Sequence, residues 1–159
     1  MLKEIIWVVV WTILPITELR ASIPLGILKY NLSPWVVVAT AIIANIIIGI
    51  VIYLLLGKIV LLLQRFPKLK RFYDKTVIRI QKKISKPVEK WGWIALAVFI
   101  GIPLPGSGVY SGAIAAEVVG IDLKRFVWAA IIGVLIAAAI VTAIVLTGTG
   151  LASVFISHI

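Results

Sequence analysis

Residues 15–24 read PITELRASIP, and residues 103–108 read PLPGSG. Each segment interrupts a long hydrophobic stretch, the first running over residues 5–28 and the second over residues 91–120. Inside a bilayer, a backbone that leaves the helical conformation loses hydrogen bonds that lipid cannot replace, so breaks survive only where protein or a water-filled cavity surrounds them. Matching breaks in the two halves of a membrane protein are typical of a transporter's binding site.

The composition predicts an integral membrane protein without a separate soluble domain, because 62% of the 159 residues are hydrophobic. The chain has no cysteine, which excludes disulfides, thiol nucleophiles and thiolate metal sites. It also has no His/Asp/Glu cluster at metal-ligand spacing, no nucleophile elbow and no phosphate loop. We therefore expect no enzymatic activity, no metal and no cofactor.

Residues 58–90 carry most of the positive charge of the chain. Eleven of the sixteen lysines and arginines lie there, against two acids, Asp74 and Glu89. The positive-inside rule places this linker in the cytoplasm, where it would rest on anionic lipid headgroups. Residues 76–86 within it have the pattern of an interfacial amphipathic helix. A nucleic-acid partner is not expected, because membrane spans tether the linker at both ends.

Two uninterrupted apolar segments, residues 35–57 and 126–147, are each long enough for one crossing. With the linker inside, the first span begins outside and the second begins inside, beside Lys124 and Arg125. Each interrupted stretch must then return to the face from which it entered. A rival topology, in which each interrupted stretch crosses fully, would scatter the basic clusters over both faces.

The predicted fold is therefore an all-α, multi-pass cell-membrane protein with two inverted repeats. Residues 1–57 form the first repeat, with a re-entrant helical hairpin at about 5–28 and a transmembrane helix at about 35–57. Residues 91–159 form the second, with a re-entrant hairpin at about 91–120, a transmembrane helix at about 126–147 and a short tail. Inverted repeats of this kind place a site at the membrane midplane, between the two hairpin tips.

Glu18 and Arg20 are the first candidates for that site, because ionisable groups in a membrane segment usually face a cavity or a partner. We interpret Glu18 as a group that takes and releases a proton, and Arg20 as a contact for an anion. Residues two apart point to different sides of a helix, so direct pairing needs the non-helical geometry that Pro15 and Pro24 permit. The alternative is a mutually neutralising pair, or an Arg20 side chain that caps hairpin carbonyls.

The second break supplies mainly backbone groups. Its candidate site residues are Pro103, Pro105, Gly106, Ser107 and Gly108. A half-helix beginning at Val109 would point its first amides into the midplane, which favours an anion. Alternatively, the turn only lets the hairpin reverse tightly.

Three further residues are secondary candidates: Asn45, Tyr110 and Glu117. Asn45 forms a stripe with Ala41 and Gly49, and residues 129, 133 and 137 (Ala, Gly, Ala) form a similar one, which indicates close helix packing. Tyr110 could line a path, and Glu117 is expected at the solvated cytoplasmic end of the second hairpin.

The motifs ELRASIPLG at residues 18–26 and PLPGSGVYSGA at residues 103–113 resemble those of the small multidrug export protein family. More distantly, the chain is similar to the DedA/VTT membrane proteins. The resemblance to the DedA/VTT proteins implies paired re-entrant hairpins and proton-dependent transport of a lipid carrier. It also implies that Glu18 and Arg20 have roles like those of the acidic and basic hairpin residues of the DedA/VTT proteins.

From the residues and the resemblance together, we expect a small, homodimeric transporter that exports or flips an amphipathic or anionic small molecule or lipid, coupled to protons. One alternative is a flippase or scramblase for a polyprenyl phosphate or a phospholipid. Another is a membrane scaffold subunit that transports nothing and whose breaks serve packing alone.

Overall fold

The structure, a computed structural model, describes residues 2–15, 17–63, 91–103 and 107–156. Every regular element in these ranges is a helix. The chain divides into two compact units, Met1–Asn45 with Leu135–Ile159, and Ile46–Val134. Most of the basic linker, its amphipathic helix at 76–86, and the site candidates Pro105 and Gly106 lie outside the described residues.

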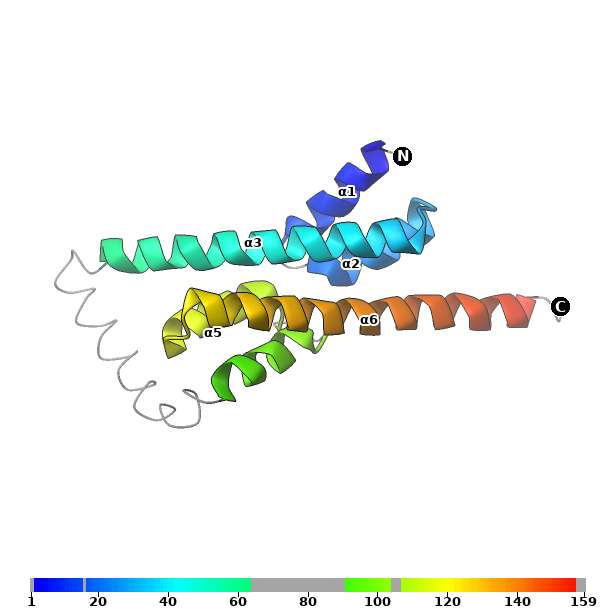
Figure 1. Cartoon of the computed structure of the whole chain (residues 1–159). Helices are drawn as coiled ribbons and strands as arrows, with labels where there is room; N and C mark the ends of the chain where they lie inside the picture. Colours follow the sequence, from blue (N-terminus) through cyan, green and yellow to red (C-terminus); the bar gives the residue numbers. More distant parts are fainter. Residues whose placement is uncertain (1, 16, 64–90, 104–106, 157–159) are drawn as a thin grey trace. The chain divides into compact units, whose positions relative to one another are not determined.

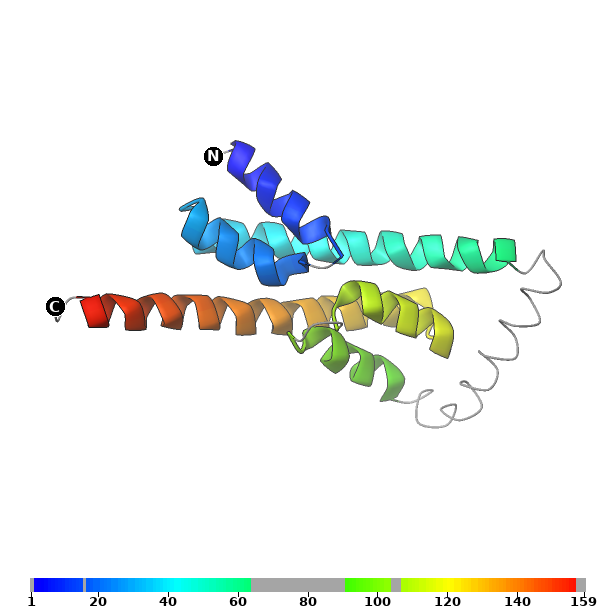
Figure 2. The same cartoon turned by 180° about the vertical axis from the view of Figure 1, so that it is seen from behind.

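A short helical hairpin opens unit 1. Helix α1 spans Leu2–Ile13, α2 spans Glu18–Pro24, and the π-helix η1 continues over Leu25–Lys29. Figures 1 and 2 show α1 and α2 side by side. The 12 residues of α1 reach about 18 Å, close to half the hydrocarbon thickness of a bilayer. A helix of this length suits a hairpin that enters a membrane without crossing it. That the hairpin is re-entrant stays a prediction.

The first break is shorter than the sequence suggests. We expected a non-helical segment up to Pro24, but the helix resumes at Glu18 and Pro24 lies inside α2. The proline removes one backbone donor, and the following turn takes the wider π geometry, in which the Tyr30 amide bonds the Leu25 carbonyl at 3.0 Å. The π turn therefore accommodates the missing amide donor of Pro24, and the helix continues.

Two long apolar helices, α3 (Pro34–Leu63) and α6 (Leu123–Ile156), contribute to both units. Their apolar stretches, Pro34–Val60 with 27 residues and Leu123–Gly148 with 26, are long and apolar enough to cross a membrane. Both helices exceed the predicted spans, 35–57 and 126–147. Helix α6 starts early because Asp122 caps it, its Oδ1 accepting the Arg125 amide at 3.0 Å.

Unit 1 packs the first hairpin onto the beginning of α3. A Cβ atom at Gly26 would lie 2.5 Å from Val37 Cγ1 and 3.1 Å from Val8 Cγ2, so only a glycine allows this approach. Val37, Ala41 and Asn45 are all fully buried and follow each other at intervals of four. They form one buried stripe on α3.

Unit 2 contains the second pair of short helices, Trp91–Gly101 and α5 (Val109–Val119), beside the start of α6 (Figures 1 and 2). Ile100 holds them together, because it lies directly against both Gly112 and Gly133. Gly49 lies still closer to Val109, against which a Cβ atom at this position would collide. The close packing predicted at Gly49 and Gly133 is therefore confirmed within the chain.

The end of unit 2 is fixed by Tyr53. Its ring stacks on Phe126 with centroids 4.8 Å apart, and its hydroxyl donates a 2.8 Å hydrogen bond to the Ile121 carbonyl. This contact joins the second half of α3 to the turn that connects α5 with α6.

Candidate functional site

Glu18 begins α2 and is a buried carboxyl group. Only 5% of the residue is exposed, although both arms of the hairpin are strongly apolar. Its amide donates to the Leu14 carbonyl at 3.0 Å, which closes the turn after α1. Its φ angle is 45°, in the left-handed region that side chains other than glycine rarely adopt.

The backbone at Glu18 is therefore strained. For an L-residue other than glycine, this conformation costs about 1–2 kcal/mol. Strained residues persist where the surrounding structure holds them, and they cluster at functional sites. An apolar residue would fill this buried position without a charge, and a glycine would fill it without strain. A buried glutamate here points to a role for the carboxyl group.

Arg20 lies in the same helical turn and is half-buried. Consecutive residues of a helix are turned by about 100°, so the side chains of Glu18 and Arg20 leave α2 in different directions. Pro15 is exposed in the turn, which the Thr17 hydroxyl stabilises by donating to the Trp11 carbonyl at 2.6 Å. The first turn of α2 therefore carries both a buried glutamate and a half-buried arginine.

Two buried hydroxyls join the arms of this hairpin. Thr12 of α1 and Ser22 of α2 share a hydrogen bond of 2.7 Å, and Thr12 also bonds the Val8 carbonyl at 2.7 Å. Neither residue was among the sequence candidates. The available signal was that Thr12 is the single polar residue of the segment 5–14.

Thr12→Val and Ser22→Ala should each lower the free energy of unfolding by about 1 kcal/mol, because each leaves a buried partner with an unmade hydrogen bond. The double variant should lose less than the sum of the two, since both remove the same bond. Unfolding in mixed detergent micelles measures the cycle. Thr147→Val, which removes an exposed hydroxyl bonded to the Ala143 carbonyl, is the matched control. Strict additivity would contradict the shared bond.

Other buried polar atoms of unit 1 have no hydrogen-bond partner among the described residues. Among them are the indole Nε1 of Trp11, both amide atoms of Asn45 and the hydroxyl of Thr142. Asn45 is fully buried near the middle of the apolar part of α3. Unpaired polar groups at such depth are rare and require an explanation, such as a water, an ion or a ligand. Asn45 therefore stays a secondary candidate, and Trp11 joins it.

A serine and a glycine stabilise the backbone at the end of the second break. The Ser107 hydroxyl donates to the Ile102 carbonyl at 2.5 Å. Gly108 has a φ of 120°, a backbone conformation that glycine adopts readily and other residues rarely adopt. The Gly108 carbonyl accepts a 2.8 Å hydrogen bond from the Gly112 amide at the start of α5. Pro103 follows the helix Trp91–Gly101, and Tyr110 is half-buried in the first turn of α5.

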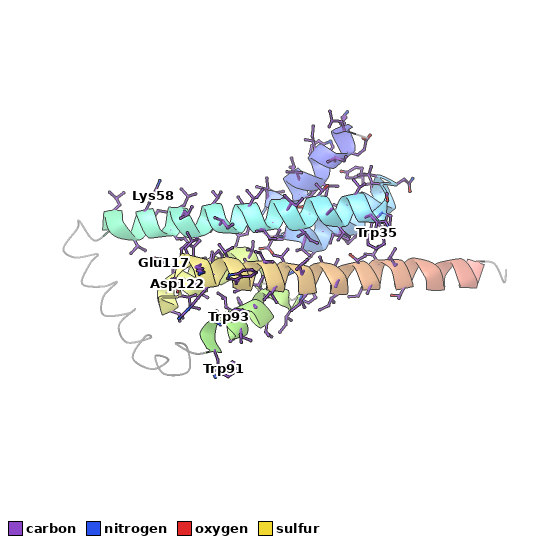
Figure 3. The ribbon with its side chains drawn as sticks, in the orientation of Figure 1. Trp35, Lys58, Trp91, Trp93, Glu117 and Asp122 are labelled. Atoms are coloured by element: carbon purple, nitrogen blue, oxygen red, sulfur yellow. The ribbon has the colours of Figure 1, made fainter. Side chains whose placement is uncertain are left out.

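Glu117 lies near one end of unit 2, together with Lys58 and Asp122 (Figure 3). It is half-buried, and its Oε2 is 4.0 Å from the position that a Cβ atom at Gly57 would take. Asp122 forms an ion pair with Arg125 at 3.3 Å, and both side chains are more than half exposed. An exposed pair of this kind contributes little stability. The predicted position of Glu117 at the solvated cytoplasmic end of the second hairpin stays a prediction.

One family model matches the chain, over residues 18–140, and it is described as "Putative small multi-drug export protein". The chain belongs to this family. The match begins at the buried Glu18, directly after the turn of the first hairpin, and contains α2, the second break and the apolar part of α3. No curated protein and no solved structure matches the chain. Together with the two long apolar helices, membership of an export family indicates a membrane protein.

In this member of the family, the candidates fall into two sets. Unit 1 holds Pro15, Glu18, Arg20, Pro24 and Asn45; unit 2 holds Pro103, Ser107, Gly108, Tyr110 and Glu117. The structure describes each set by itself, and a common site at the two hairpin tips stays a prediction. Among the described residues, no three His, Asp or Glu side chains gather where they could hold a metal ion.

Proposed function

We propose that the protein exports an amphipathic or anionic substrate across the cell membrane, and that protons drive the transport. In this proposal Glu18 takes up and releases the proton, and Arg20 contacts the anionic part of the substrate. The hairpin turn carries both groups, so protonation of Glu18 and substrate binding at Arg20 would act on the same element.

One observation carries the proposal: Glu18 is a buried carboxyl group in a strained conformation at the turn of an apolar hairpin. Burial of a charged carboxylate is unfavourable, and protonation removes the charge. A carboxyl group in such a place is suited to alternate between two protonation states. The family name, which refers to export, supports the same class of function.

We also propose that the two helical hairpins are re-entrant and enter the membrane from opposite faces, with the linker of residues 58–90 in the cytoplasm. The lengths of α1 and α5, 12 and 11 residues, support this topology, because each reaches only about half of a 30 Å hydrocarbon layer. The charges at Lys58, Glu117 and Asp122 support a polar boundary at one end of unit 2.

Transport by the purified protein in vesicles tests the proposal. We expect an amphipathic or anionic dye to move under an inward or outward proton gradient at a saturable rate well above that of protein-free vesicles. A protonophore should return the rate to the background, because it removes the driving force. Vesicles that contain the protein in the absence of a gradient are the control.

Two other outcomes would replace the proposal by one of its rivals. If a phosphate-headed lipid crosses and soluble amphiphiles do not, the protein is a lipid flippase or scramblase. If the folded protein moves neither class of compound, the result favours a membrane scaffold subunit that transports nothing.

A further inference from the structure

Two contacts fix how the arms of the first hairpin lie against each other. Thr12 and Ser22 share the hydrogen bond of 2.7 Å. Four residues away on each arm, a Cβ atom at Gly26 would lie 3.1 Å from Val8 Cγ2. Each step back along α1 is therefore matched by an equal step forward along the second arm, as in two antiparallel helices (Figures 1 and 2).

The same counting extends from the second arm to α3. Gly26 also lies directly against Val37, and the short segment 30–33 reverses the chain between η1 and α3. Both figures show α2 beside the first part of α3. Glu18 precedes Gly26 by eight residues and Asn45 follows Val37 by eight. Each interval rises about 12 Å along its helix, so Glu18 and Asn45 lie at the same level of unit 1.

This level of unit 1 is enclosed by the chain itself. Asn45 has no exposed surface, and Glu18 is only 5% exposed. A lipid or a second copy of the protein cannot reach an amide that its own chain covers completely. Any partner of the Asn45 side chain must therefore be small enough to be enclosed with it.

The amide of Asn45 needs a partner that both donates and accepts hydrogen bonds. Its Oδ1 and its Nδ2 are both buried without a partner among the described residues. A bare cation would serve only the oxygen, and a simple anion would serve only the nitrogen. Water serves both, and buried waters typically bond polar groups that would otherwise be unpaired. The chemistry of Asn45 therefore selects water.

The surroundings of Asn45 are polar enough to hold water. The carboxyl group of Glu18 has about four acceptor sites when it is charged, so it can bond a water in addition to other partners. Ser22, one turn after Glu18, belongs to the buried pair of hydroxyls with Thr12. Ala41, one turn before Asn45, leaves more space than a larger apolar residue would. A buried water requires this combination of polar partners and space.

We propose that ordered water binds between the side chains of Asn45 and Glu18 and hydrogen-bonds both. In the proposed transport, this water would solvate the charged form of Glu18, and Asn45 would act through the water as a positioning residue. That role rests on the proposed function. The water site itself follows from burial and hydrogen bonding and does not require that Glu18 carry protons.

Radiolytic footprinting of the full chain in phosphatidylcholine nanodiscs tests the water site. Irradiation converts bound water into hydroxyl radicals, which oxidise the nearest side chains even where bulk solvent does not reach. We expect oxidation of Leu19, which follows Glu18 and is 2% exposed. Val37, fully buried and about 12 Å along α3 from Asn45, should stay unoxidised. No oxidation of Leu19, or equal oxidation of both residues, would overturn the proposal.

The rate of water exchange separates bound water from an open aqueous path. The protein is mixed with water that contains heavy oxygen just before irradiation. The label at Leu19 should take up heavy oxygen more slowly than the label at Lys124, which is exposed. Equal uptake at the two residues would overturn the assignment of ordered water.

Substitutions of Asn45 test which group holds the water. Asn45→Leu should abolish the label at Leu19, because leucine has a similar size but forms no hydrogen bond. Asn45→Ser keeps a donor and an acceptor and should keep the label. Thr142→Val is the matched control, since it removes another buried polar atom of unit 1 without a partner among the described residues. An unchanged label in Asn45→Leu would contradict the site.

Dye transport under a proton gradient tests the role of the water. Asn45→Leu should lower the rate by about tenfold or more, as expected for the loss of a hydrogen bond to a charged group. Asn45→Ser should restore most of the rate. If Asn45→Leu loses the label at Leu19 but keeps its rate, the water site stands and its role in transport is wrong. If the unaltered protein shows the label without proton-driven transport, the proposed function fails alone.

Discussion

Glu18→Gln is expected to reduce proton-driven transport by about a hundredfold or more, because a positioned proton-transfer group typically contributes at least that much. Glutamine keeps the length and the hydrogen-bonding shape of the side chain but cannot take up a proton. The fold should persist, since the backbone hydrogen bond from residue 18 to Leu14 does not involve the side chain. Dye transport in vesicles under a proton gradient measures the effect.

Two further substitutions separate charge from conformation at this position. Glu18→Asp keeps a carboxyl group and should retain part of the transport rate. Glu18→Gly removes the carboxyl group but accepts the φ of 45°, so it should raise the free energy of unfolding by about 1 kcal/mol while transport is lost. A gain in stability together with a loss of function is the signature of a residue kept for its chemistry.

Glu4→Gln is the matched control, since Glu4 is a carboxyl group in the first turn of α1 on the same hairpin. It should leave the transport rate unchanged. If Glu18→Gln and Arg20→Ala both transport at the rate of the unaltered protein while remaining folded, the proposed site is wrong.

Gly133→Ala is expected to destabilise the protein by about 1–3 kcal/mol, because the added methyl group overpacks a close helix contact. At this position a Cβ atom would lie 2.7 Å from the Ala97 carbonyl oxygen and 2.7 Å from Ile100 Cβ. Neither atom is the end of a flexible side chain, so the helices themselves must separate. Gly133→Val should be worse, and unfolding in mixed micelles measures both.

The same helix provides the control. Gly148 has no atom within 4 Å of the position of a Cβ atom. Replacing such a glycine by alanine ordinarily stabilises a helix by about 1 kcal/mol. Gly148→Ala and Gly133→Ala should therefore shift stability in opposite directions. A stabilising effect at both positions would show that the contact between Gly133 and the helix Trp91–Gly101 is looser than the structure describes.

The sequence was sufficient to predict the helices and the breaks between them, since both depend on local chemistry. Proline and glycine at 15 and at 103–108 interrupt the apolar pattern, and the long helices follow from uninterrupted runs of apolar residues. The prediction at Pro24 was wrong, because a proline costs a helix only one donor and its neighbours can compensate by a wider turn. The early start of α6 was readable from Asp122, a favourable capping residue.

The geometry of the candidate site could be predicted from the sequence less well than the helices. Nothing local requires a positive φ at Glu18; a turn of four residues between two packed helices imposes it. The bond between Thr12 and Ser22 joins residues ten apart in sequence, and its register depends on how the arms pack. The unpaired amide of Asn45 is a property of its surroundings, which composition does not reveal.

The π-helix η1 has a consequence for how the family can vary. A π turn holds one residue more than an α turn, and an extra residue rotates everything after it by about 100° around the helix axis. The direction in which Lys29 and Tyr30 face is thus set by a single inserted position, independently of the Glu18 end of the same arm. Evolution could redirect the outer rim of this hairpin by gaining or losing one residue, while the chemistry at its turn remained untouched.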